Sequence, residues 1–114
     1  MAQIDKLFYL LKERKGSDLH ISVGAPPLLR ISGDLTPVTN SILPQAETKK
    51  LLYEIMSDSQ IKRFEEKMEL DFAYAIAGLA RFRANIFMQY RGIAGVFRII
   101  TEEILTVEQL KSPP

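Results

Sequence analysis

The stretch LDFAYAIAGLARFRANIFMQYRGIAGVFRII, residues 70–100, carries most of the strand signal in this chain. Apolar and polar side chains alternate along it, as they do in strands with one buried face. Gly78 and the pair Arg91-Gly92 interrupt the alternation, so the stretch predicts three antiparallel strands joined by tight turns. The apolar row on one face of this meander comprises Leu70, Phe72, Tyr74, Ile76, Phe82, Ala84, Ile86, Met88 and Tyr90.

The residues before the meander predict the other elements of the domain. Apolar residues at helical spacing indicate a helix over residues 3–15, and from Ser17 the period changes to two, which indicates a strand. Two short strands follow, and then two helices, the second of which begins at the capping-box pair Ser57 and Gln60. Strands at both ends with helices between them predict an α+β domain.

Composition excludes several classes of function. The chain has 114 residues, enough for one domain with a modest core. Its net charge is +1, so an electrostatic function requires local clustering of charge. With no cysteine and one histidine, the chain has no disulfide or thiolate site, and no metal site is predicted. No apolar run is long enough to span a bilayer.

The segment SDLH, residues 17–20, contains a serine, an aspartate and the single histidine. Side chains alternate between the two faces of a strand, so Asp18 and His20 share one face and Ser17 lies on the other. A hydrolase triad is built from distant segments, so these neighbours do not form one. Asp18 and His20 are predicted to form a solvated or hydrogen-bonded pair.

A second cluster is made of arginines. No acidic residue and no lysine occurs between Asp71 and Glu102. Arginine is preferred where a planar group with several donors must bind phosphate or carboxylate. The arginines in this window are Arg81, Arg83, Arg91 and Arg98.

The predicted register brings two of these arginines together. With Arg91-Gly92 at the turn, Asn85 faces Arg98, and Arg83 lies diagonally from Arg98 on the same face. Such a diagonal spans about 7–8 Å, so both guanidinium groups could reach one anion. An ordinary exposed sheet face, with arginines paired to acids on nearby helices, fits the same residues, and both interpretations stay open.

Recognition of nucleic acid is not predicted. The segment RGIAGVFR, residues 91–98, begins like the signature strand of an RNA-recognition motif. However, Ile93, Gly95 and Arg98 stand where stacking aromatic residues are required. An RNA-binding module is therefore the weakest alternative.

Three segments, taken together, resemble one family. They are KGSDLHISVGAPPLLRISGDL (15–35), residues 70–100, and LTVEQL (105–110). In this order and spacing they are similar to the N-terminal domain of the PilT-type type IV pilus retraction ATPases, within the secretion ATPase superfamily. The resemblance implies a PAS-like antiparallel sheet of about six strands with helices packed on it. A stand-alone PAS-like sensing or scaffold domain is the main alternative.

The resemblance also implies a division of the chain and of its roles. Residues 1–104 would form the PAS-like domain, and residues 105–114 would begin the linker or helix towards a RecA-like ATPase domain. Arg83 and Arg98 match the family's arginines that contact ATP phosphates, and Arg81 and Arg91 would lie in the interdomain or nucleotide region. Asp18 and His20 would hold structure or an interface.

For the complete protein the resemblance implies a homo-hexameric ATPase that uses ATP and Mg²⁺. It would be cytoplasmic, peripheral to the inner membrane, and would contact pilus-base proteins and the motor domains of its own and neighbouring subunits. This chain has no G-x-x-x-x-G-K-[ST] phosphate loop, so we expect it to hydrolyse no ATP by itself.

Overall fold

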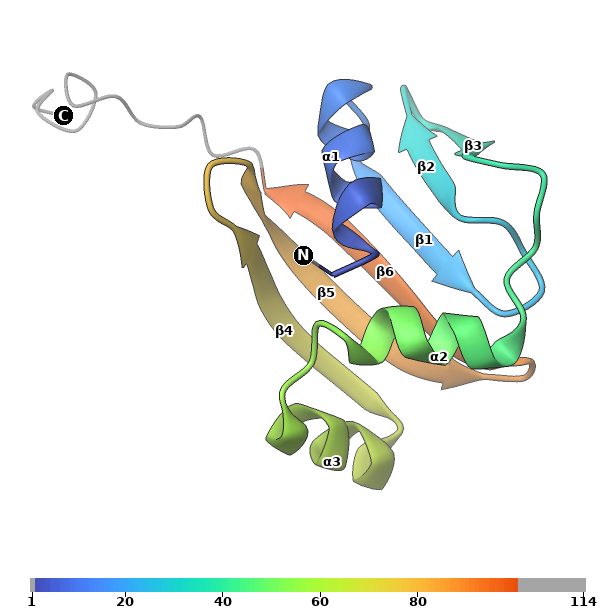
Figure 1. The fold of residues 1–114 in the computed structure, drawn as a ribbon, viewed down its shortest axis with the longest axis vertical. Helices are drawn as coiled ribbons and strands as arrows, with labels where there is room; N and C mark the ends of the chain where they lie inside the picture. The colour runs from blue at the N-terminus through green and yellow to red at the C-terminus, as the bar shows by residue number, and fades with distance from the viewer. Residues whose placement is uncertain (1, 101–114) are drawn as a thin grey trace, which may run out of the picture.

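The computed structural model describes residues 2–100 of the chain. The element order agrees with the order predicted from the sequence (Figure 1). The elements are α1 (Asp5–Glu13), β1 (Asp18–Ser22), β2 (Leu28–Ile31), β3 (Asp34–Pro37), α2 (Gln45–Tyr53), α3 (Asp58–Lys67), β4 (Glu69–Ile76), β5 (Ala80–Gln89) and β6 (Gly92–Ile100). The predicted boundary at residue 104 and the predicted linker, residues 105–114, lie outside the described residues.

All six strands form one antiparallel sheet with the order β3-β2-β1-β6-β5-β4. The two hairpins nearest the ends of the chain meet where β1 pairs with β6, with Leu19 opposite Phe97. Strands from opposite ends of the sequence therefore lie side by side in the middle of the sheet (Figure 1). The structure confirms the predicted α+β class and the antiparallel sheet.

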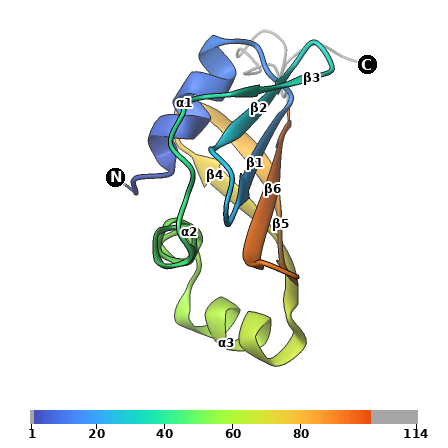
Figure 2. The ribbon, with the colours of Figure 1, turned by 90° about the vertical axis from the view of Figure 1, so that its right-hand side faces the viewer.

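α1 and α2 lie on one side of the sheet, α3 lies beyond its lower end in the view of Figure 2, and no described element covers the opposite face. The core lies between α1, α2 and the sheet, where alternation sends the apolar side chains of each strand. At its centre the buried Phe8 ring of α1 stacks on Phe82 and meets Phe97 edge-on. None of the helices between residues 2 and 100 is long and apolar enough to cross a membrane.

The predicted capping box at the start of α3 is confirmed. The Ser57 hydroxyl accepts a hydrogen bond from the Gln60 amide at 3.2 Å, and the Gln60 side chain accepts one from the Ser57 amide at 2.9 Å. These two bonds satisfy backbone donors that have no partner within the helix.

The predicted turn between β5 and β6 is wrong by one position. Tyr90 and Arg91 form the loop, and Gln89 pairs with Gly92, which is already the first residue of β6. Gly92 has φ +134°, and a Cβ there would lie 3.1 Å from Cγ2 of Val23. The glycine therefore permits close packing and an unusual backbone angle at the strand start, instead of marking the centre of the turn.

Candidate functional site

A row of charged residues crosses the uncovered face of the sheet. Backbone pairing places Arg30 of β2 opposite Asp18 of β1, Asp18 opposite Arg98 of β6, and Arg98 opposite Arg83 of β5. Residues that pair directly across antiparallel strands project from the same face. We call Arg30, Asp18, Arg98 and Arg83 the charged row.

The pairing of Arg83 and Arg98 corrects the predicted register. They lie directly opposite each other, not diagonally, and Asn85 pairs with Val96 instead of Arg98. The error is two residues, so the prediction that both arginines share a face still holds. Direct pairing brings their Cβ atoms to about 5 Å, closer than a diagonal would.

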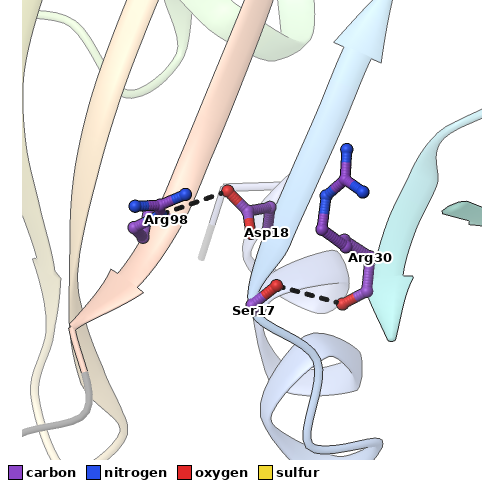
Figure 3. Close-up of polar contacts among 4 residues, drawn as sticks. All are labelled: Ser17, Asp18, Arg30 and Arg98. Atoms are coloured by element: carbon purple, nitrogen blue, oxygen red, sulfur yellow. Dashed lines mark hydrogen bonds and ion pairs between the residues drawn. The ribbon is translucent and has the colours of Figure 1, made fainter. Parts of the chain in front are cut away.

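Arg98 is the arginine of this pair with a partner in the described part of the chain. Its Nε donates a long hydrogen bond to Oδ2 of Asp18 at 3.4 Å (Figure 3). The Asp18 side chain is 7% exposed, whereas the Arg98 side chain is 72% exposed. A guanidinium has five N–H donors, so a bond at Nε leaves the terminal nitrogens available for a second partner.

Arg30 does not neutralise Asp18 from the other side. Its guanidinium Nη1 donates to the carbonyl of Gly33 at 2.9 Å, within the turn between β2 and β3. Among the residues that the structure describes, Oδ1 of Asp18 has no hydrogen-bond partner. A buried carboxylate oxygen without a donor is energetically costly, which makes Asp18 an unusual feature of this face.

Arg83 is exposed and faces Arg98 across a shallow depression of about 250 Å³. Like charges directly opposite each other on a sheet are destabilising. An anion between the two guanidinium groups would be attracted to both of them and would offset their mutual repulsion. Planar, multi-donor groups of this kind bind phosphate and carboxylate oxygens in pairs. The depression is lined by Asp18, Asp71, Arg83, Ala84, Asn85, Val96 and Arg98.

The other two predicted arginines lie in different places. Arg81 is exposed on the same face as Arg83 and pairs with Ile100, one step nearer the end of β6. Arg91 lies in the loop between β5 and β6, and its guanidinium is next to Gly24. Six strand positions separate Arg98 from Gly92, a length of roughly 20 Å. The structure thus does not bring Arg91 to the charged row.

The geometry of the SDLH segment agrees with the alternation argument. The Ser17 hydroxyl lies 3.5 Å from the carbonyl oxygen of Arg30, to which it donates (Figure 3). Asp18 and His20 share the uncovered face, opposite Arg98 and Val96 respectively. Ser17 therefore makes no contact of the kind a nucleophile needs with His20.

Burial lowers the pKa of His20 below its ordinary value of 6.5. The Asp18 carboxylate raises this pKa by a smaller amount, and the positive charge of Arg30 lowers it. The imidazole is therefore neutral at pH 7, and the unfolded chain binds a proton to this group more readily than the folded chain does.

From this pKa we expect a specific loss of stability in acid. The contribution of His20 is fully present above pH 6.5 and decreases as the pH falls below that value. Urea unfolding of the 114-residue chain between about pH 7.5 and pH 5.5 should show that His20→Gln loses less stability than the wild type. An equal loss in both proteins would contradict the assignment.

The sequence did not indicate that Asp18 and Asp71 lie beside the arginines, or that Arg30 belongs to the charged row. The window between Asp71 and Glu102 has no acid, yet in space Asp18 contacts Arg98 and Asp71 lines the same depression. Oδ1 of Asp71 accepts a hydrogen bond from the side-chain Nδ2 of Asn85 at 2.5 Å. Only the pairing of β1 with β6, across 80 residues, brings Asp18 to this place. Between residues 2 and 100, Arg98 pairs with Asp18 of β1 and not with a helix acid, and α1 and α2 lie on the other side of the sheet (Figure 2).

Comparison with known proteins identifies relatives for most of the chain. No protein-family model matches it. The chain is 42% identical over 107 residues to the type IV pilus retraction ATPase PilT of Pseudomonas aeruginosa, covering 94% of this chain and 31% of that protein. It is 36% identical over 111 residues to the type IV pilus ATPase PilU of the same organism, covering 97% of this chain and 29% of that protein.

A solved structure gives the same assignment. The crystal structure of the pilus retraction motor PilT with bound ADP matches with a TM-score of 0.75 and 33% identity, over 94% of this chain and 32% of that chain. This chain thus spans less than a third of the length of the two curated relatives. Sequence and fold give the same assignment, and the chain belongs to the PilT-type pilus ATPase family as its N-terminal domain.

Proposed function

We propose that this domain is part of a longer ATPase that retracts type IV pili and so drives twitching motility. The relatives that support the proposal are named as a pilus retraction ATPase and a pilus ATPase. The RecA-like motor domain would follow this domain in the chain and would hold ATP with Mg²⁺. Six such subunits would form a ring on the cytoplasmic side of the inner membrane, against the pilus-base proteins.

Within that assembly, the uncovered face of the sheet would dock against the nucleotide. The observation that carries this proposal is the direct pairing of Arg83 and Arg98 on a face that no described element covers. Two guanidinium groups about 5 Å apart at Cβ can bind oxygens of one phosphate chain. Arg81, on the same face, would add positive charge nearby, and Arg91 would lie at the domain boundary.

An arginine at this position would supply the positive charge that phosphoryl transfer needs. Negative charge spreads over the equatorial oxygens of the transferred group in the transition state, and a guanidinium supplied from a neighbouring domain or subunit stabilises it. The cation would also withdraw when the domain moves away. Hydrolysis would thereby depend on how this domain sits on the motor domain.

Complementation of a strain that lacks the full-length gene tests this function. The wild type and Arg63→Ala, a matched change of an exposed arginine on α3, should both restore twitching motility. Arg83→Ala and Arg98→Ala should produce normal amounts of protein without restoring it. Normal motility with both of the latter variants would rule out the proposed role of the pair.

A further inference from the structure

We propose that Asp18 is a positioning residue that holds Arg98 by Nε and thereby directs its terminal nitrogens towards the nucleotide phosphates. The inference rests on the proposed function of Arg98. It assigns Asp18 a more specific role than the structural or interface role expected from the sequence.

Asp18 and Arg98 differ in burial, as a fixed positioning group and a mobile ligand-binding group should. The Asp18 carboxylate is almost completely buried on β1, a strand that is paired on both sides, by β2 and by β6. Arg98 is largely exposed, and a free arginine side chain samples many rotamers. A rigid carboxylate at Nε restricts that sampling before any ligand arrives (Figure 3).

The contact also makes the two facing arginines unequal. Arg30, on the far side of Asp18, donates to the Gly33 carbonyl, so it does not compete for the carboxylate. Within residues 2–100, Arg83 makes no ion pair of the kind that Arg98 makes. Asp18 should therefore influence the chemical step through Arg98 and not through Arg83.

A carboxylate in this position has a second, opposite effect on the nucleotide. Asp18 lines the same depression as the two arginines, and its negative charge repels bound phosphate. Removing the charge should therefore leave ATP binding unchanged or strengthen it, while the loss of orientation slows the chemical step. A change that merely damaged the fold would weaken binding and turnover together.

Steady-state ATPase kinetics of the full-length protein test the proposal. Asp18→Asn keeps the side-chain shape, and we expect kcat to fall about 10²-fold, the effect of misplacing a catalytic group by about 1 Å, with KM unchanged or lower. Glu69→Gln is the matched control, because it neutralises an exposed carboxylate of β4 outside the depression. Its kcat should stay within about twofold of the wild type.

A double-mutant cycle distinguishes positioning from general damage. In an Arg98→Ala background, Asp18→Asn should cause no further loss of kcat, since the residue it positions is absent. In an Arg83→Ala background, the two losses should multiply. If Asp18→Asn unfolds the protein or prevents its assembly, Asp18→Ser, which leaves a smaller neutral polar group, replaces it in the cycle.

The outcomes separate this inference from the function on which it rests. Normal kcat in Asp18→Asn, or losses that multiply in the Arg98→Ala background, would overturn the positioning role while the role of Arg98 stands. Normal turnover in Arg98→Ala itself would overturn the proposed role of Arg98 and this inference together.

Discussion

Replacing Arg83 or Arg98 with alanine in the full-length ATPase is expected to abolish most of its turnover. Arginines that stabilise a transferred phosphoryl group contribute roughly 10³–10⁵ to the rate. We expect kcat to fall by about 10³-fold in each variant, with a much smaller change in ATP affinity. A coupled ATPase assay on the assembled protein measures both quantities.

Three further variants make this prediction specific. Lysine should not rescue either position, because an ammonium group cannot bind two oxygens in the planar geometry of a guanidinium. Arg63→Ala, on α3 and outside both the charged row and the depression, should hydrolyse ATP at the wild-type rate. Loss of an exposed arginine changes the folding free energy little, so all these variants should assemble. Wild-type kcat in both Arg83→Ala and Arg98→Ala would exclude a phosphate-binding role.

Replacing Phe8 with alanine is expected to cause the largest loss of folding stability. Its buried ring lies 4.3 Å from Phe82, 5.1 Å from Phe97 and 5.6 Å from Tyr74, measured between ring centroids. Truncation of a buried phenylalanine removes apolar burial and leaves a cavity, which costs about 3–5 kcal/mol. In a domain of this size the melting temperature should fall by roughly 15 °C or more.

The neighbouring residue supplies the control for this prediction. Tyr9 occupies the next position of α1 and is 40% exposed. Tyr9→Ala changes helix propensity similarly without opening the core, so we expect a loss below about 1 kcal/mol. Urea and thermal unfolding of the 114-residue chain measure both variants. Equal stability losses for Phe8→Ala and Tyr9→Ala would show that α1 does not anchor the core as described.

Local periodicity predicts the order and type of the elements, whereas the PAS-like sheet of about six strands is an expectation from the family resemblance. The alternation along residues 70–100 identified three strands and the face on which Phe82 and Ile86 are buried, because one-sided burial imposes a period of two. The same period placed Arg83 and Arg98 on one face, and a register error of two residues could not change that. The strand positions and the face of each side chain depend on residues that are neighbours in the sequence, so they can be predicted from the sequence alone.

Features that depend on distant segments could not be predicted in this way. Periodicity does not distinguish Tyr90-Arg91 from Arg91-Gly92 as the turn, and Gly92 packs close to Val23, which is distant from it in the sequence. The ion pair between Asp18 and Arg98 joins strands at opposite ends of the chain. A search for acids near the arginines in sequence could not find it.

A structure of the full-length protein with a non-hydrolysable ATP analogue and Mg²⁺ tests the central claim most directly. It measures the distances from the guanidinium nitrogens of Arg83 and Arg98 to the phosphate oxygens. We predict that both arginines contact phosphate at hydrogen-bonding distances of about 2.7–2.9 Å. An uncovered sheet face that points to solvent, with both guanidinium groups more than about one Debye length (~8 Å) from the nucleotide, would contradict it.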